Sequence, residues 1–282
     1  RELVWKVHFE HSQALSRAAD ASAFGLMTMS NRHTSISEAR NAILTKARQA
    51  LVRSILACPL NLRWKIWLVG ARLEVSAGRI SCARRLLCQA LAEAPPKTRC
   101  TAYLECSRLE EYVGNVDSAR RILQHACEEV PHEWKTSLEL TLLEARAGRL
   151  LHATRLARQS LYQHPGTGRI WALYVQLCHR LEGFEGLWLP TQNTTATAAE
   201  TAAASLLDDK ASSAQEKPPS KHDALLNALR NVPKSGEVWA EGARCRLNPL
   251  RYNCFDLGGA QKFLGFAIQF TPQYGDTFLE LL

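Results

Sequence analysis

Arginines recur in register along this chain and are the residues that most clearly suggest binding chemistry. The first arginine row comprises Arg85, Arg121 and Arg155, and Lys262 stands in the same register further along. In a stack of repeated units, equivalent positions form a ladder along one surface. The row is therefore a candidate contact for RNA phosphates or for an acidic peptide of a protein partner. The alternative is a solvated helix face, which also carries repeated arginines, and the sequence alone weighs the two about equally.

The second arginine row lies one position before the first and consists of Arg48, Arg84 and Arg120. We expect these side chains to form ion pairs inside each repeat with three glutamates, Glu74, Glu110 and Glu144. We favour this structural role over phosphate binding for the second row, because charged side chains are rarely buried unless they are paired.

The residues that usually carry catalysis form no recognisable constellation. His8 and His11 stand at i, i+3 on a predicted helix, but a metal site there needs further ligands that the sequence does not indicate. The adjacent carboxylates of Glu110 and Glu111 point to different helix faces. There is no glycine loop that could cradle a phosphate and no nucleophile motif. The sequence predicts no enzyme activity, no catalytic residue, no metal site and no cofactor.

Composition narrows the class of protein further. Nine cysteines, none in CxxC spacing, are typical of free thiols in a reducing compartment. The formal net charge of +8 suits an anionic partner, although many basic proteins bind no nucleic acid. No run reaches the roughly 18 apolar residues of a membrane span. We therefore expect no membrane partner. Because the chain starts at Arg1 and not at Met, we expect an internal or trimmed segment.

The elements that must position these side chains follow from an internal repeat. Pro59, Pro95, Pro131 and Pro165 are separated by 36, 36 and 34 residues. Gly78, Gly114 and Gly148 follow the last two of these steps, and so do Ala83, Ala119 and Ala153. Three residue types in one register predict an all-α, right-handed solenoid of stacked antiparallel helix pairs.

One repeat shows how each helix pair is expected to begin and end. A first helix over 64–77 stops at Gly78, which suits the left-handed turn after a helix. Ser81, like Asp117 one repeat later, stands where the residue that caps the second helix belongs. The second helix covers 82–93, and Pro95 ends it.

Aromatic and small residues at equivalent positions predict the core of the repeat. The large residues of the first helices are Trp67, Tyr103, Trp171 and Trp239, and the small residues of the second helices are Ala83, Ala119 and Ala153. The tryptophans could stack on bases, but at helical spacing in a repeat they are far more often packed between helices. Small alanines allow neighbouring helices to approach closely, and isolated pairs cannot bury such a stripe alone.

The repeat is interrupted, which predicts a division of the chain. We expect repeats over residues 1–189, a flexible low-complexity insertion over 190–221, and further repeats over 222–282. A loop is expected over 21–36, and a second insertion over 248–255. A last helix is expected to be capped by Asp276.

With these motifs in place, the chain resembles the HAT repeats (half-a-tetratricopeptide). That family has a Leu-Glu pair in the first helix, as at Leu73-Glu74 and Leu109-Glu110, and an Ala-Arg pair in the second, as at Ala83-Arg84. Ordinary tetratricopeptide repeats want Gly and Tyr at two fixed offsets after the tryptophan, where this chain has Ala71 and Glu74.

The resemblance implies a scaffold of an RNA-processing or ribonucleoprotein complex, made of several proteins and acting by protein binding. It implies an intracellular location, in the nucleus, with an organelle as the alternative. Direct, sequence-independent RNA binding through the first arginine row is one alternative function, and a tetratricopeptide-like peptide adaptor is another. Self-association into a homodimer also stays open.

Overall fold

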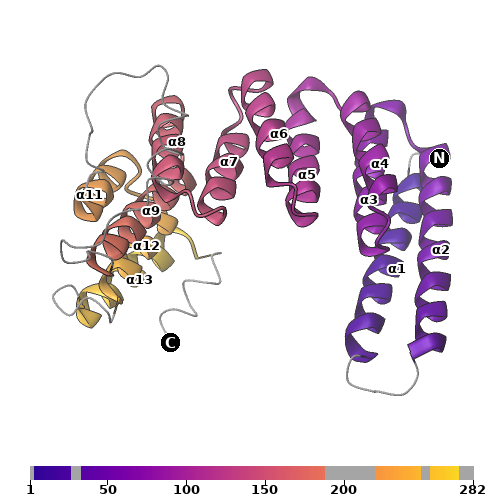
Figure 1. The fold of residues 1–282 in the computed structure, drawn as a ribbon, viewed down its shortest axis with the longest axis horizontal. Coiled ribbons are helices and arrows are strands. Elements are labelled where there is room, and N and C mark those ends of the chain that lie inside the picture. The colour runs from indigo at the N-terminus through magenta and orange to yellow at the C-terminus, as the bar shows by residue number, and fades with distance from the viewer. Residues whose placement is uncertain (1–2, 27–32, 188–219, 249–254, 273–282) are drawn as a thin grey trace, which may run out of the picture. The chain divides into compact units, whose positions relative to one another are not determined.

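The computed structural model describes residues 3–26, 33–187, 220–248 and 255–272, in which twelve α-helices and two short 3-10 helices form and no strand occurs (Figure 1). The α-helices are α1 Val4–Leu26, α2 His33–Ala57, α3 Arg63–Ser76, α4 Ile80–Glu93, α5 Arg99–Tyr112, α6 Val116–Glu129, α7 Trp134–Arg146, α8 Leu150–Gln163, α9 Gly168–Leu187, α11 Lys221–Asn231, α12 Gly236–Arg246 and α13 Leu257–Phe270. The predicted all-α class is confirmed.

The chain forms two compact units, residues 1–140 and 141–282. In the first unit, neighbouring antiparallel helices pair as α1 with α2, α3 with α4, and α5 with α6 (Figure 1). Helix α4 of one pair also contacts α5 of the next. In the second unit, α9 packs against α8, α11 and α12, and α12 packs against α13. Stacked helix pairs, as predicted from the repeat, are therefore present in each unit.

The turn between the helices of a pair is built on a glycine. Gly78, Gly114 and Gly148 have φ angles of 74°, 90° and 81°, in the left-handed region that a side chain would strain. After Gly78, the amide of Arg79 donates to the carbonyl of Glu74 over 2.8 Å, which satisfies an otherwise open helix end. The predicted glycine ends of the first helices are confirmed.

The predicted caps of the second helices are wrong. Helix α4 starts at Ile80 with Arg79 as the N-cap residue, and Ser81 lies inside the first turn. Helix α6 likewise starts one residue before Asp117. The glycine turn already directs the backbone into the next helix, and the amide of Ala83 bonds to the carbonyl of Arg79 over 3.1 Å. The helix therefore begins without a side-chain cap.

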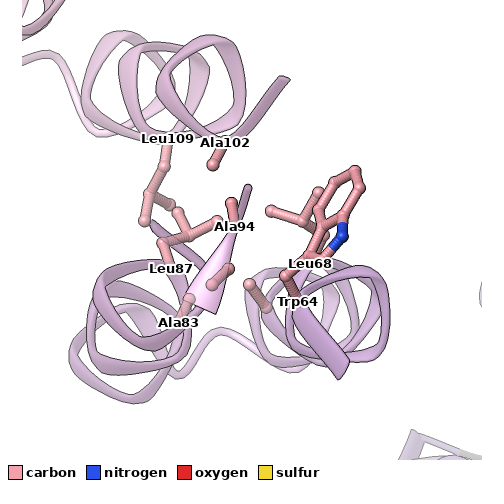
Figure 2. Close-up of a cluster of buried hydrophobic side chains, with 9 residues drawn as sticks. Trp64, Leu68, Ala83, Leu87, Ala94, Ala102 and Leu109 are labelled. Atoms are coloured by element: carbon pink, nitrogen blue, oxygen red, sulfur yellow. The ribbon is translucent and has the colours of Figure 1, made fainter. Parts of the chain in front are cut away.

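Close packing of small and large side chains forms the core between successive pairs. Figure 2 shows side chains of α3, α4 and α5, and of Ala94 directly after α4, meeting between the three helices. The labelled residues are Trp64, Leu68, Ala83, Leu87, Ala94, Ala102 and Leu109. Leu87 is 4% exposed, and full burial of a leucine contributes roughly 1.5–3 kcal/mol. Ala83 is fully buried, and a larger side chain at this position would hold the helices apart.

Several sequence-based boundaries change or fall outside the described residues. The loop expected over 21–36 is too long, because α1 continues to Leu26 and α2 begins at His33. The segment after position 20 contains no proline, so nothing in it stops α1 there. Most of the insertion predicted over 190–221, most of 248–255, and Asp276 lie outside the described residues, and the predicted division of the chain stays a prediction. None of the described helices is both long and apolar enough to cross a membrane.

Candidate functional site

Glu74, near the end of α3, binds two arginines, one on α2 and one directly before α4. Glu74 is 6% exposed. Arg48 of α2 donates from Nε to its Oε1 over 2.8 Å, and Arg79 donates from Nε to its Oε2 over 2.6 Å. Burial raises the pKa of Glu74, but the hydrogen bonds and charges of the two arginines outweigh it and hold the pKa below its usual value. The ionised carboxylate therefore ties α2 to α3.

The same arrangement recurs at the end of α5. Arg84 of α4 donates to both carboxylate oxygens of Glu110, over 2.7 and 2.9 Å, and Asn115 donates to Glu110 over 3.0 Å. The hydrogen bond from Arg84 is the largest of the effects that lower the pKa of Glu110. The sequence predicted that each arginine pairs with a glutamate of its own repeat, and for Arg84 this is wrong. The arginine pairs with the glutamate of the following pair, because the second helix of one repeat packs on the first helix of the next.

The polar group of each aromatic side chain at the repeated position of the first helices forms a hydrogen bond within its own unit. The indole of Trp67 donates to Glu93 over 2.8 Å, and the hydroxyl of Tyr103 bonds to Glu129. Burial, followed by that bond, raises the pKa of Tyr103 to about 12. In the second unit, Trp171 and Trp239 donate to the carbonyls of residues 165 and 233, over 2.8 and 2.7 Å. Side chains held in this way are packed against the protein.

The small residues that the sequence predicted for the core lie on the second helix of each pair. Ala83, Ala119 and Ala153 are all fully buried, at 0% exposure. They lie at the positions where α4, α6 and α8 approach their neighbours, which leaves the opposite helix faces to solvent.

The first arginine row lies on those solvent-facing sides. Arg85, Arg121 and Arg155 are exposed. Arg85 donates to the sulfur of Cys82 over 3.5 Å, and Arg121 donates to the hydroxyl of Ser118 over 3.2 Å, each one helical turn earlier. Arg85 and Arg121 occupy equivalent positions in the first unit. Arg155 and Lys262 belong to the second unit, where Lys262 is also exposed on α13.

A set of charges that the sequence analysis did not single out crosses from α3 through α5 to α7, and we call it the charge ladder. Its members are Arg72, Glu105, Arg108 and Glu139. Arg72 donates to both oxygens of Glu105, over 2.9 and 2.7 Å, and Arg108 contacts Glu105 at 3.3 Å and Glu139 at 3.4 Å. The spacing of 36 residues between the two arginines and 34 between the two glutamates, equal to the repeat, is the signal that could have revealed them.

The ladder presents its positive groups outward. The side chains of Arg72 and Arg108 are 63% and 54% exposed, whereas those of Glu105 and Glu139 are 13% and 14% exposed. Burial raises the pKa of Glu105. The hydrogen bond from Arg72 and the charges of both arginines outweigh this effect and hold the pKa below its usual value. The carboxylate of Glu105 is thus ionised, and both glutamates contact the guanidiniums from the less exposed side.

A cavity of about 350 Å³ lies beside the ladder, between α3, α4 and α5. Its walls include Ala71, Val75, Leu87 and Leu109, and Tyr112 stands at its edge with 72% of its surface exposed. Small-ligand sites in proteins have volumes of about 300–1,000 Å³ and similarly apolar walls. The cavity is therefore large enough to receive a side chain of a partner.

Histidines, cysteines and carboxylates are spread over the described part of the chain. No three His, Cys, Asp or Glu side chains there come together as the ligands of a metal ion would. Burial raises the pKa of the Cys100 thiol to about 11 and that of the Cys106 thiol to about 12. Both thiols are protonated at neutral pH and are weak nucleophiles.

Comparisons with known proteins agree with this architecture. The model of the family described as PRP6, TPR-like domain (tetratricopeptide-like) matches residues 1–199. A TPR-containing protein of Dictyostelium discoideum is 39% identical over 150 residues, which cover 53% of this chain and 8% of that protein. The matched region is thus a small part of that relative.

Solved structures of TPR proteins are similar over most of the chain. The C-terminal part of a TPR repeat-containing protein from Cytophaga hutchinsonii has a TM-score of 0.46 and 10% identity, with 99% of each chain covered. A thermophilic TPR protein from Thermus thermophilus has a TM-score of 0.44 and 14% identity, with 77% of this chain and 96% of that chain covered.

Proposed function

The chain belongs to the PRP6 TPR-like domain family, and from this premise we propose that it is a scaffold that binds protein partners within an RNA-processing complex. That it is a helical-repeat scaffold for protein interaction follows from the family and the stacked helix pairs. The PRP6 family is one of splicing factors, which supports the RNA-processing role and a nuclear location.

One observation carries the proposal, namely the way in which charges join the helix pairs. Glu74 and Glu110 each accept hydrogen bonds from an arginine of the preceding pair. These pairs, together with the alanine contacts, hold the outer faces of α3–α6 in fixed positions relative to one another. A surface that is already ordered loses less entropy when it binds a partner. Binding energy can then be spread over several repeats.

The test is affinity purification of the tagged chain from its own cells, with and without ribonuclease. We expect a set of RNA-processing proteins to co-purify and to persist after ribonuclease. The matched control is Leu123→Asp, which places a charge at a core position that is 1% exposed and should unfold the first unit. The proposal fails if the persisting proteins have no role in RNA processing, or if the control retains the same set.

A second function, direct RNA binding, is favoured by the exposure of the first arginine row. Arg48 and Arg84 form ion pairs with glutamates. Arg85 and Arg121, by contrast, donate to the uncharged side chains of Cys82 and Ser118 on their own helices. Two guanidiniums at equivalent positions of one unit could each neutralise a phosphate.

This second function predicts a specific salt dependence. RNA affinity is measured by fluorescence-anisotropy titration with a single-stranded RNA at several salt concentrations. The double variant Arg85→Glu and Arg121→Glu should bind more weakly. The steepness of log K against log salt should fall by about 1.4, since each lost phosphate contact removes about 0.7. The control with the same charge change is Arg17→Glu and Arg53→Glu, at exposed positions on α1 and α2. Equal losses in both variants would show a nonspecific effect of net charge, and no RNA binding by the parent would leave only the scaffold.

A further inference from the structure

We propose that the cavity between α3, α4 and α5 receives a peptide segment of a protein partner in which an apolar side chain stands next to an Asp or Glu. The inference rests on the proposed function as an interaction scaffold, and it specifies the chemistry of the partner.

The walls select the apolar side chain. Ala71, Val75, Leu87 and Leu109 supply hydrocarbon from three helices, and Leu87 and Leu109 are also part of the core shown in Figure 2. Apolar surface removed from water contributes roughly 25 cal/mol per Å². A leucine- or phenylalanine-sized group that enters would bury mainly its own surface, because Ala71, Leu87 and Leu109 are already only 1%, 4% and 5% exposed.

The rim selects the acidic neighbour. Each guanidinium carries five N–H donors, of which the contacts with Glu105 use two from Arg72. Arg108 contacts Glu105 and Glu139 through its two Nη atoms. Because the two carboxylates lie beneath and the guanidiniums face outward, an approaching chain meets donors and positive charge. A carboxylate accepts from these donors, whereas a lysine or arginine of the partner has no acceptor to offer them.

The preorganised rim favours specificity over simple attraction. The two glutamates offset the charges of the two arginines, so the ladder as a whole carries little net charge. What remains is a fixed pair of hydrogen-bonding guanidiniums, whose side-chain freedom has already been lost to Glu105 and Glu139. A partner carboxylate therefore gains hydrogen bonds without ordering either arginine.

Tyr112 marks the mouth of the cavity. It is 72% exposed at the end of α5, next to Val113, which is 41% exposed. Exposed tyrosine beside an apolar cavity is typical of residues that dominate binding energy at protein interfaces, because one end is apolar and the other hydrogen-bonds. A peptide backbone crossing the mouth would cover this ring.

The experiment begins with a random peptide library displayed on phage and selected against the full chain. We expect enriched sequences that pair Leu, Ile, Met or Phe with an adjacent Asp or Glu. A fluorescein-labelled synthetic peptide of the enriched sequence is then titrated by anisotropy. Replacement of its acid by the amide should weaken binding about tenfold, the effect of losing a charged hydrogen bond of about 1.4 kcal/mol. A library that yields no such pattern overturns the proposal.

Variants then locate the bound peptide. Tyr112→Ala should weaken binding at least about tenfold, as for an interface anchor, and Ser76→Phe, which fills the cavity from its wall, should abolish it. The matched control is Tyr162→Ala, which removes a tyrosine with 76% exposure on α8 and should leave affinity unchanged. Equal affinity for Tyr112→Ala and the parent overturns the proposal, provided that circular dichroism shows both folded.

Failure of this inference and failure of the proposed function give different results. If RNA-processing proteins co-purify equally with the parent and with Tyr112→Ala, the scaffold stands and the cavity is not its docking site. If the peptide binds as expected but no RNA-processing protein co-purifies, the cavity stands and the proposed function fails. Binding of a small acidic compound but of no peptide would also overturn the assignment to a protein partner.

Discussion

At the scale of single residues, Glu74 joins helices through its side chain and closes a helix end through its backbone. Its side chain accepts from Arg48 and Arg79, while its backbone carbonyl accepts the amide of Arg79 after the glycine turn. The residue therefore closes the end of α3 and fixes α2 against it. A neutral side chain of the same shape would keep the backbone bond and lose the charge pairing.

The replacement Glu74→Gln should lower the free energy of unfolding by about 2–3 kcal/mol. Breaking a buried ion pair costs about 3–5 kcal/mol, and the effect is smaller here because Arg48 and Arg79 have 28% and 50% of their side chains in contact with water. Glu110→Gln, which affects one arginine that is 43% exposed, should cost about 1 kcal/mol. Urea unfolding followed by tryptophan fluorescence measures both, and the reverse order would contradict the assigned role of Glu74.

Cysteine reactivity should follow burial. Cys88 is exposed, whereas Cys58 and Cys100 are buried and burial raises the pKa of each thiol. At neutral pH, Cys88 should react with a maleimide within the time in which those two thiols stay unmodified. Mass spectrometry of the digested protein at successive times measures each site, and unfolding in urea should make the three rates similar. Early labelling of Cys100 in the folded protein would contradict its placement.

At the scale of elements, the helix pairs depend on the glycine turns. Gly114 has a φ of 90°, with no neighbouring atom within 4 Å of an added Cβ. Strain from an added side chain would therefore come from the backbone alone, and not from a clash. Such a position separates the conformational requirement of the turn from its packing.

Gly114→Ala should reduce the free energy of unfolding by about 1 kcal/mol, because a left-handed conformation costs a residue with Cβ roughly 1–2 kcal/mol. The matched change Gly265→Ala, on α13, also meets no atom within 4 Å and has no left-handed φ. It should stabilise by about 0.5–1 kcal/mol through helix propensity. Thermal unfolding by circular dichroism compares them, and a loss of stability in both would show that space, and not φ, limits these positions.

At the scale of the whole molecule, ion pairs between repeats make the first unit sensitive to acid. The pKa values of Glu74, Glu105 and Glu110 are all held below that of an ordinary glutamate, by the arginines that contact them. The unfolded chain therefore binds more protons than the folded chain near and below the ordinary glutamate pKa of about 4.3. Their contribution to stability is complete above that value and disappears as the pH falls through their lowered values.

Urea unfolding of the protein should therefore give a stability that changes little between about pH 7 and about pH 5 from these groups, and that falls below about pH 4.5. The triple variant Glu74→Gln, Glu105→Gln and Glu110→Gln should be less stable at neutral pH and should lose less stability on acidification. An unchanged acid dependence in the triple variant would show that other carboxylates determine it.

The sequence by itself determined the repeat and the glycine ends of the first helices, because these depend on local spacing and on the preference of glycine for a left-handed turn. It placed the caps at Ser81 and Asp117 wrongly, because a tight turn can start the next helix without a side chain. It also put each arginine with the glutamate of its own pair, since spacing along the chain does not say which neighbouring helix packs against which. Only the tertiary structure joined Arg84 to Glu110 and brought Arg72 and Arg108 to the edge of one cavity. Such contacts join residues 26 or more positions apart, and they exist only when the helices are stacked.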